Sequence, residues 1–281
     1  MKNRIQGTTV LTGLLGYPIK HSRSPHMHNT AFRKLGLDYA YLAFDIEEGN
    51  LQEGINAMRT FNAKGFNITM PLKERVIDYL DEISDDARII GSINTVLNNR
   101  GKLIGYNTDG RGFVKALEES KVQYLDKKIV IIGAGGAGKA VGIQLAYEGA
   151  KEIILMNRTF DKAKKIADRI HENIPTSKAR ALPLDESILK EELKDSHIFI
   201  NCTPVGMKDS IDQSLVTDKS TLHKDLFVVD IIYDPLKTKL LTIAEEVGCK
   251  TMNGIGMMIY QGALAFKIWT GEEMPIEEIY E

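Results

Sequence analysis

The sequence of 281 residues has little of what several classes of protein depend on. It contains only two cysteines, Cys202 and Cys249, which are too few for a disulfide scaffold or a thiolate-rich structural metal site. No segment approaches the ~18–20 uninterrupted apolar residues of a membrane helix. Neither sign of charge predominates, since 36 Lys+Arg stand against 38 Asp+Glu and the formal net charge is −2. This balance argues against a nucleic-acid coat or a polybasic membrane-binding protein.

The composition that remains is that of an ordinary globular chain. Hydrophobic residues make up 43% and charged residues 26% of the sequence, close to the averages for soluble proteins. The length predicts about two domains or one large α/β domain. Lys2 and Arg4 precede a mildly apolar stretch at 7–16, but its three threonines favour a strand and turn over a signal peptide. We therefore expect a cytoplasmic protein.

Strand-like and helix-like segments alternate along the chain from residue 10 onward. In the first half, strands are expected at 10–16, 39–46, 64–70 and as a pair within 93–109, with helices at 24–36, 48–60, 71–80 and from Asp109, as N-cap, to 119. In the second half, strands are expected at 127–133, 152–157, 197–203 and 226–233, with helices to about 149, at 161–170 and at 255–269. This alternation predicts a parallel sheet covered by helices on both faces.

A glycine-rich stretch, GAGGAG at 133–138, lies between a predicted strand and a predicted helix. It fits G-x-G-x-x-G, whose glycines let backbone N–H groups and a helix N-terminus approach a pyrophosphate. With Lys139 it also nearly completes the phosphate loop of nucleotide hydrolases, but that motif needs Ser or Thr next, and position 140 is alanine. An ordinary tight turn would not need four glycines in six residues. The stretch therefore predicts a dinucleotide-binding site.

The strand after the glycine-rich stretch indicates which dinucleotide binds. NAD-binding proteins usually have Asp or Glu about 20 residues downstream, where the carboxylate holds the ribose 2′-hydroxyl. Here the strand ends at Asn157-Arg158-Thr159, and a guanidinium can hold a 2′-phosphate through two hydrogen bonds. This favours NADP over NAD. Two alternatives stay open: the nearby Asp161 is the acidic residue typical of NAD-binding proteins, or Arg158 is a solvated residue that binds no ligand.

The first half carries polar residues where a plain core would not place them. HSRSP puts Ser22 and Ser24 at a helix start, where two hydroxyls can bind an anion such as a carboxylate. The other candidates stand in the motifs NITMPLK, INT and YNTDG and are Asn67, Thr69, Lys73, Asn94 and Asp109. Lys73 is expected in the first turn of the helix that Pro71 begins. Taken one by one, each residue also fits a role as a cap, a turn residue or a surface charge.

Together and in this order, these segments resemble the shikimate dehydrogenase family over nearly the whole chain. The matching motifs are HS-x-SP-x-MHN, N-x-T-x-P-x-K, NT, YNTDG-x-GF, GAGGAG, NRT, N-x-TP-x-GM, YDP-x-x-T-x-LL and GMM-x-x-QG. The resemblance implies reversible, NADPH-dependent reduction of 3-dehydroshikimate to shikimate in aromatic amino acid (chorismate) biosynthesis. Departures at Arg23, Ser92 and Lys139 remove no functional position.

The resemblance also implies an architecture. An α/β protein is expected, with a Rossmann-type parallel-sheet nucleotide domain at 109–252. Across a cleft it would face an α/β substrate domain made of 1–108 and completed by the helices of 253–281. The partner would be a small-molecule substrate rather than nucleic acid or membrane, and a monomer and a homodimer both fit.

The site residues follow by carrying the family's motifs over, position by position. The substrate carboxylate would be held by Ser22 and Ser24, with Tyr233 nearby, and the ring hydroxyls would meet Asn67, Thr69, Asn94, Asp109 and Gln261. Lys73 would be the acid–base residue, hydrogen-bonded to Asp109. The cofactor would contact Gly133, Ala134, Gly135, Gly136, Ala137, Asn157, Arg158, Thr159 and Lys162, with Thr203, Ile231 and Gly254 on the nicotinamide side and a weaker contact at Asp85.

This assignment is chemically coherent. Hydride transfer to a ketone leaves an alkoxide, and a positioned ammonium both stabilises that charge and donates the missing proton. No metal is required, and His21, His26 and His28 lack the neighbouring carboxylates or cysteines of a zinc site.

Two alternative functions remain at this point. One is an NAD-dependent quinate/shikimate dehydrogenase, because the segment 205–218 resembles quinate-accepting relatives, whereas Asn67 and Thr69 favour shikimate. The other is a non-catalytic dinucleotide sensor, which would keep the fold and lose the chemistry. The presence of both Lys73 and Asp109 argues against the sensor.

Overall fold

The structure, a computed structural model, describes residues 5–279 and consists of two compact units. The first unit combines Met1–Thr108 with Gln261–Glu281, and the second is Asp109–Tyr260. The boundaries expected from the sequence lie at 108/109 and 252/253. The chain thus leaves the first unit at Thr108 and re-enters it at Gln261.

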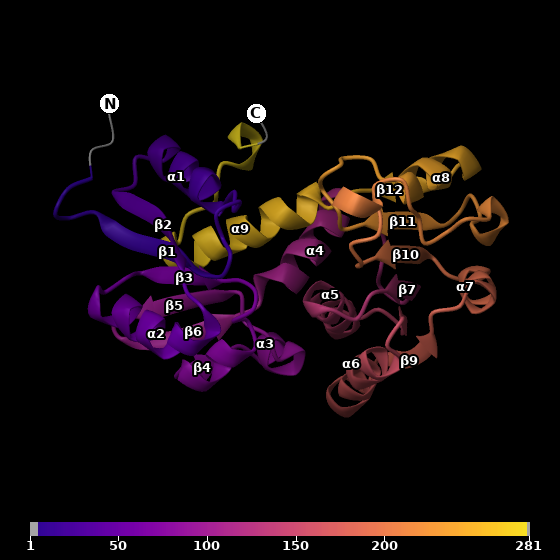
Figure 1. Ribbon diagram of the computed structural model, residues 1–281, viewed down its shortest axis with the longest axis horizontal. Coiled ribbons are helices and arrows are strands. Elements are labelled where there is room, and N and C mark those ends of the chain that lie inside the picture. Colours follow the sequence, from indigo (N-terminus) through magenta and orange to yellow (C-terminus); the bar gives the residue numbers. More distant parts are fainter. Residues whose placement is uncertain (1–4, 280–281) are drawn as a thin grey trace. The chain divides into compact units, whose positions relative to one another are not determined.

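A mixed sheet forms the centre of the first unit. Its strands are β1 (Val10–Gly16), β2 (Tyr39–Asp45), β3 (Gly65–Ile68), β4 (Glu82–Ile83), β5 (Thr95–Asn99) and β6 (Lys102–Tyr106). They lie in the order β2-β1-β3-β5-β6-β4, as Figure 1 shows. β1 pairs in parallel with β2 and β3, whereas β5 runs antiparallel to β3 and β6. The β5–β6 turn contains Arg100 and Gly101 in the left-handed region, which matches the predicted Asn-Asn-Arg-Gly turn.

Helices cover this sheet and bury two apolar clusters. They are α1 (Ser24–Lys34), η1 (Glu48–Asn50), α2 (Leu51–Thr60), η2 (Arg75–Tyr79), α3 (Asp85–Ile90), η5 (Ile276–Glu278) and the later part of α9 (Ile255–Thr270). One cluster includes Ile55 of α2 and Phe66 of β3. The other joins Phe32 of α1 to Phe266 and Trp269 of α9. The C-terminal part of α9 is therefore core structure of the first unit.

Trp269 shows how closely α9 packs on the first sheet. Its indole Nε1–H donates to the carbonyl oxygen of Val96 at 3.0 Å, and the side chain is only 1% exposed. A methyl group on Gly65 would overlap the indole ring. Position 65 must therefore be glycine, because the indole ring occupies the space that a side chain would need.

The second unit contains a parallel sheet. Its strands are β7 (Lys128–Ile132), β8 (Glu152–Asn157), β9 (Lys178–Pro183), β10 (Ile198–Asn201), β11 (Phe227–Asp230) and β12 (Lys250–Met252). Every pairing is parallel, in the order β12-β11-β10-β7-β8-β9. The central strands are buried almost throughout, as expected where both faces of a parallel sheet are covered. This is the strand order of a Rossmann-type sheet, and it confirms the predicted fold.

The helices of the second unit follow from their sequence patterns. They are α4 (Thr108–Glu119), α5 (Gly136–Tyr147), α6 (Phe160–Asn173), α7 (Glu186–Leu193), α8 (Lys239–Val247), η3 (Lys208–Ser210) and η4 (Lys219–Thr221). In α6, the buried residues Ala163, Ile166, Ala167 and Ile170 recur at helical spacing, so one apolar stripe faces the sheet. Within residues 5–279, no helix is both long and apolar enough to cross a membrane.

Two local expectations were wrong, and both errors lie next to the candidate site. Residues 71–80 form turns and the short 3₁₀ helix η2 rather than an α-helix. The carbonyl of Lys73 accepts the N–H of Ile93 at 2.8 Å, so it does not accept the helical bond from residue 77.

The second error concerns the start of α4. This helix begins at Thr108, so Asp109 lies inside its first turn rather than at the N-cap. Asn94 Oδ1 accepts the Thr108 N–H at 2.7 Å, which supplies a capping acceptor from a different segment of the chain.

Candidate functional site

Two serines lie at the start of α1 in the first unit. Ser24 is the first residue of the helix, and its N–H donates to Ser22 Oγ at 3.3 Å. This bond uses an acceptor position of Ser22 and leaves its hydroxyl hydrogen available to a ligand. Arg23, the N-cap residue, makes no side-chain capping bond. Ser22 and Ser24 therefore place two hydroxyls at the start of a helix, an arrangement that suits a carboxylate.

Asn67 and Thr69 lie at the carboxyl end of β3. Asn67 is 7% exposed, and its Nδ2 donates to the carbonyl of Asn94 and to Thr95 Oγ1, each at 3.0 Å. The Thr69 N–H donates to the carbonyl of Leu15 at 2.9 Å. The Asn67 side chain and the Thr69 backbone are thus held by contacts with neighbouring segments of the sheet.

Asn94 belongs to a buried group of polar side chains between β3 and α4. Its Oδ1 accepts from Thr95 Oγ1 at 3.1 Å and from the Thr108 N–H at 2.7 Å, and its Nδ2 donates to Thr108 Oγ1 at 3.0 Å. The Ile68 N–H donates to the Asn94 carbonyl at 2.9 Å. These bonds fix Asn94 beside the end of β3.

Lys73 is half-buried in the turn that follows β3. Because its carbonyl binds the N–H of Ile93, the residue before Asn94, the lysine is tied to the same end of the sheet as Asn67 and Thr69. The first unit therefore brings together four of the predicted residues: a primary amine, two amides and a hydroxyl.

The remaining predicted substrate residues lie elsewhere in the chain. Gln261 belongs to the first unit, within α9, and is half-buried. Asp109 is the first residue of the second unit, and Tyr233 follows β11 in that unit with 42% of its surface exposed. The pairing of Lys73 with Asp109, and the approach of Tyr233 to the serines, involve both units and stay predictions. So does the cofactor contact of Asp85, an exposed residue that begins α3 of the first unit.

The glycine-rich stretch connects β7 to α5 in the second unit. Gly133 has φ +108°, and a Cβ there would lie 2.7 Å from the carbonyl of Cys202. A methyl group on Gly138 would overlap the carbonyl oxygen of Gly133. In contrast, Gly135 and Gly136 are exposed, and a Cβ on either would meet no atom within 4 Å. Two glycines are thus required by the fold, and two leave open space in front of the helix N-terminus.

The end of β8 supplies the next predicted cofactor residues. Asn157 Oδ1 accepts the Ala134 N–H at 3.1 Å, and its Nδ2 donates to the carbonyl of Thr159 at 2.9 Å. Asn157 thereby joins the glycine-rich stretch to the β8–α6 connection. Arg158 and Lys162 are both exposed, and within the described residues neither takes part in an ion pair. Two cationic side chains are therefore available to an anionic ligand at the carboxyl end of β8.

The connections after β10 and β11 share a hydrogen-bond network that sequence reasoning missed. Asp230, fully buried, accepts from Asn201 Nδ2 at 3.1 Å and from Thr238 Oγ1 at 2.7 Å. Asn201 Oδ1 in turn accepts from the Thr203 N–H and Oγ1–H at 2.8 and 2.7 Å. Burial raises the pKa of Asp230, and the three hydrogen bonds it accepts oppose that rise. A carboxylate ending a buried apolar strand is the signal that could have identified it.

Gly254 and Cys202 complete this side of the second unit. A methyl group on Gly254 would overlap the carbonyl of Ile231, so two of the predicted nicotinamide-side residues are in backbone contact. Burial, followed by the charge of Asp230, raises the pKa of the Cys202 thiol. Cys202 is therefore a thiol rather than a thiolate nucleophile.

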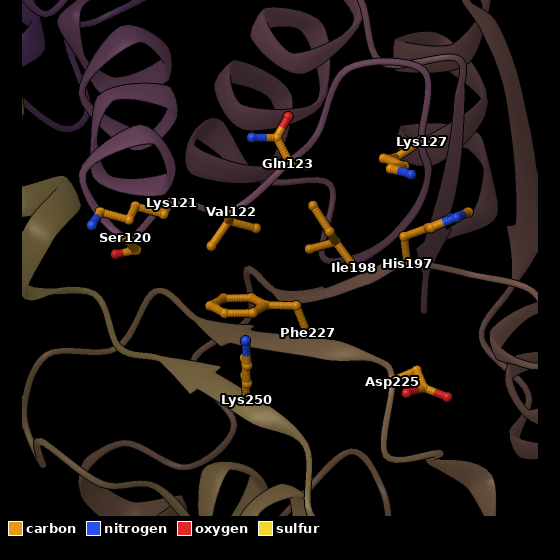
Figure 2. Close-up of a pocket in the computed structure, with 10 residues that line it drawn as sticks. All are labelled: Ser120, Lys121, Val122, Gln123, Lys127, His197, Ile198, Asp225, Phe227 and Lys250. Atoms are coloured by element: carbon orange, nitrogen blue, oxygen red, sulfur yellow. The ribbon is translucent and has the colours of Figure 1, made fainter.

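A cavity of about 240 Å³ lies at the amino-terminal ends of the strands of the second sheet (Figure 2). Four of its lining residues, Lys127, His197, Phe227 and Lys250, stand at or just before the first residues of β7, β10, β11 and β12. Ligands of open α/β sheets bind at the carboxyl ends of the strands. The cavity therefore lies at the opposite strand ends from the glycine-rich stretch and is not the nucleotide site.

The described residues contain no group of three or more His, Cys, Asp or Glu side chains placed to hold a metal ion. His28 is fully buried among aromatic rings, and burial lowers its pKa to about 3. It is therefore a neutral core residue.

Comparison with known protein families gives three matches along the chain. The shikimate dehydrogenase substrate binding domain matches residues 14–96. The shikimate / quinate 5-dehydrogenase family matches residues 116–234, and the shikimate 5′-dehydrogenase C-terminal domain matches residues 254–281. Together these ranges include the glycine-rich stretch and all the candidate substrate residues except Asp109.

Individual relatives agree with these matches. The chain is 56% identical over 279 residues to the shikimate dehydrogenase (NADP(+)) of Alkaliphilus metalliredigens (strain QYMF), covering 99% of this chain and 98% of the relative. The crystal structure of shikimate 5-dehydrogenase from Listeria monocytogenes in complex with shikimate and NAD has a TM-score of 0.97 at 44% identity, covering 100% and 98% of the two chains. Quinate dehydrogenase from Corynebacterium glutamicum in complex with NAD has a TM-score of 0.89 at 30% identity, covering 96% and 97%.

Proposed function

The chain belongs to the shikimate dehydrogenase family, and we propose that Lys73 and Asp109 carry out its acid–base chemistry. The enzyme is an NADP-dependent oxidoreductase that reversibly reduces 3-dehydroshikimate to shikimate in aromatic amino acid biosynthesis. One observation carries the assignment of Lys73. Backbone bonds from Ile68 and Ile93 gather Asn67, Asn94 and Lys73 at one end of β3. A lysine then lies at the same end of the sheet as neutral hydrogen-bonding residues that suit a polyhydroxylated ring.

The second unit fits a dinucleotide phosphate. Gly135 and Gly136 leave open space where a side chain would obstruct a pyrophosphate at the N-terminus of α5. Arg158 lies at the end of β8, exposed and without an ion-pair partner among the described residues, and would hold the 2′-phosphate that distinguishes NADP from NAD. Lys162, one turn further along, would add a second cation.

In the reaction, the chain's own residues bind the substrate and move one proton. NADPH, when bound, supplies the hydride to the carbonyl carbon. Lys73 donates a proton from Nζ to the oxygen as negative charge develops there, and accepts it in the reverse direction. Asp109 orients the ammonium of Lys73. Ser22 and Ser24 hold the carboxylate and so place the ring relative to Lys73.

We propose that shikimate is the preferred acid over quinate. Quinate carries an additional hydroxyl on the carbon that bears the carboxylate, and that hydroxyl needs space and a partner beside Ser22 and Ser24. A buried hydroxyl without a partner costs about 1–3 kcal/mol, which corresponds to a roughly ten- to hundredfold preference. The Corynebacterium quinate dehydrogenase, with its bound NAD, represents the other outcome.

Steady-state kinetics of the purified enzyme test the assignment. Initial rates are measured for shikimate and quinate, each with NADP⁺ and NAD⁺, by nicotinamide absorbance. We expect the highest kcat/KM for shikimate with NADP⁺. Comparable values for the two acids would assign a quinate/shikimate dehydrogenase instead, and no turnover of either acid would indicate a dinucleotide sensor.

We further propose that the enzyme acts in the cytoplasm on a free small-molecule substrate. Cys202 and Cys249 are both unpaired thiols, a state typical of reducing compartments.

A further inference from the structure

One phenol hydroxyl in the first unit lies between two of the proposed substrate residues. Tyr41 of β2 is 1% exposed, and its hydroxyl donates to Asn67 Oδ1 at 2.7 Å. Burial raises the pKa of this phenol, and the nearby hydroxyl of Ser24 opposes that rise. Tyr41 therefore bonds to a residue at the ring-hydroxyl end of the proposed site and lies near one at its carboxylate end.

The bond from Tyr41 determines which group Asn67 can offer to a ligand. Both hydrogens of Asn67 Nδ2 are used, one by the carbonyl of Asn94 and one by Thr95 Oγ1. With Tyr41 donating to Oδ1, the remaining capacity of the amide is one acceptor position on that oxygen. An acceptor binds a hydroxyl group and cannot bind a carbonyl oxygen. Asn67 thus suits a ring hydroxyl that is unchanged by the reaction, whereas the reacting oxygen needs a donor such as Lys73.

Contacts around Tyr41 hold the hydroxyl in place. Its ring stacks on His28 with centroids 4.5 Å apart and planes 9° apart, and Trp269 lies against it at 6.0 Å. Its backbone is bound at both polar groups by Asn29, which accepts from the Tyr41 N–H and donates to the Tyr41 carbonyl, each at 2.9 Å. His28 and Asn29 belong to α1, the helix that Ser24 begins. The phenol is therefore fixed relative to Asn67 and to Ser24.

We propose that Tyr41 is a positioning residue that sets the hydrogen-bonding direction of Asn67 for substrate binding. Asn67 keeps its bond to Tyr41 and presents its oxygen to the ring. The inference rests on the proposed function, because it takes Asn67 as a substrate residue.

Tyr41→Phe tests this role, since it removes the hydroxyl and keeps the stacked ring. We expect the KM for shikimate to rise about three- to tenfold, the value of one net hydrogen bond, with kcat changed less than about threefold and the KM for NADP⁺ unchanged. Tyr39→Phe is the matched control: Tyr39 lies on the same strand and stacks on Phe32, and within the described residues its hydroxyl has no hydrogen-bond partner. This control should leave all three constants unchanged.

A double-mutant cycle separates positioning from a general loss of structure. In an Asn67→Ala background, Tyr41→Phe should raise the KM for shikimate by a smaller factor than in the wild type, because the hydrogen-bond partner of its hydroxyl is already gone. Thr95→Val, which removes an acceptor of Asn67 Nδ2, gives a second test should Tyr41→Phe fail to fold, and should also raise that KM.

The outcomes distinguish this inference from the function on which it rests. A raised KM in Asn67→Ala together with unchanged KM values in Tyr41→Phe and Thr95→Val overturns the positioning role alone. So does an equal effect of Tyr41→Phe in both backgrounds. A wild-type enzyme without shikimate turnover, or an Asn67→Ala variant with an unchanged KM, overturns the assigned substrate site and this inference with it.

Discussion

Single side chains in the first unit hydrogen-bond to one another in a way that limits what they can offer to a substrate. Asn67 has one acceptor position left, and Asn94 Oδ1 already accepts from Thr95 and Thr108. A site built in this way is organised before the ligand arrives, so less conformational entropy is lost on binding. The group that must act chemically is then a donor with a transferable proton, which is the role that we propose for Lys73.

Replacing Lys73 tests its part in the reaction. Lys73→Ala should lower kcat about 10²–10⁴-fold, the usual contribution of a positioned acid–base group. The KM for shikimate should change much less, because the serines and amides remain. Steady-state rates in both directions measure the effect, with Lys64→Ala as a control at a half-buried lysine just before β3. Near-normal kcat with only a raised KM would contradict the acid–base role.

Arg158 is the residue that we propose selects the cofactor. Arg158→Ala should raise the KM for NADP⁺ roughly ten- to a hundredfold, since a charge-assisted phosphate contact contributes about 1.5–3 kcal/mol. The KM for NAD⁺ should stay nearly constant because NAD lacks the phosphate. Arg169→Ala is the control that removes a guanidinium from α6, the helix that follows Arg158. Equal losses with both dinucleotides would show that Arg158 does not recognise the phosphate.

In the β7–α5 connection, some glycines are required by the fold and others leave space for a ligand. Gly133 and Gly138 approach backbone atoms so closely that neither tolerates a side chain, whereas Gly135 and Gly136 face open space. The spacing of the motif thus contains two kinds of glycine. One kind keeps strand and helix in contact, and the other leaves room for a ligand.

Alanine substitutions separate these two kinds. Gly138→Ala should lower the free energy of unfolding by about 1–3 kcal/mol, because the methyl group forces the Gly133 carbonyl to move. Gly136→Ala should leave stability unchanged or slightly raised, since alanine is favoured in helices, and should raise the KM for NADP⁺. Denaturant unfolding and initial rates measure the two effects. Loss of stability in Gly136→Ala would show that the space in front of α5 is not open.

The elements that sequence patterns predicted are those whose burial shows in their own run of residues. Buried apolar runs predicted β7, β8, β10 and β11 well, because a parallel strand covered on both faces has few polar positions. β9, from Lys178 to Pro183, was not predicted, because it lies at the edge of the sheet and only one of its residues is buried. The turn at Lys73 was mistaken for a helix because Ile93, distant in sequence, binds its carbonyl.

The candidate site likewise contains residues that the sequence predicts and a residue that only the folded structure shows. The sequence indicated Ser22, Asn67 and Lys73 through motifs, since chemistry demands particular residue types at those positions. It gave no indication of Tyr41, because a tyrosine in an apolar strand looks like any core residue. Its role depends on the partner that folding brings to its hydroxyl, the amide oxygen of Asn67.

Across the whole molecule, charges nearly cancel, and one group of ion pairs is partly buried. In the second unit, Glu192 of α7 accepts from Arg180 of β9 at 3.0 and 2.7 Å and pairs with Lys128 of β7 at 2.9 Å. Arg180 also binds Glu152 of β8 at 3.0 Å. Three adjacent strands and a helix are thereby joined. Burial raises the pKa of Glu192, but the bonds from Arg180 and Lys128 outweigh it, so the pKa is lowered overall.

This group makes stability depend on pH in a predictable direction. Because the pKa of Glu192 is lower in the folded state, its contribution is complete above the unfolded value of 4.5 and is lost as pH falls through the folded value. Glu192→Gln should lower Tm at pH 7 by roughly 2–6 °C, for a loss of about 1–2 kcal/mol. The difference from wild type should shrink towards pH 3. Glu191→Gln, at an exposed pair with Lys194, should shift Tm by about 1 °C or less, and a constant difference at all pH values would contradict the assignment.

The contact between Trp269 and the first sheet has a consequence for how the protein is made. Trp269 binds the carbonyl of Val96, a residue 173 positions earlier. A ribosome adding about 5–20 residues per second needs roughly 10–35 s to synthesise that interval. During this time the second unit, which is one continuous segment, can be completed. Until α9 is synthesised, Gly65 and the aromatic cluster of the first unit are uncovered. This apolar surface is available to a chaperone during that interval.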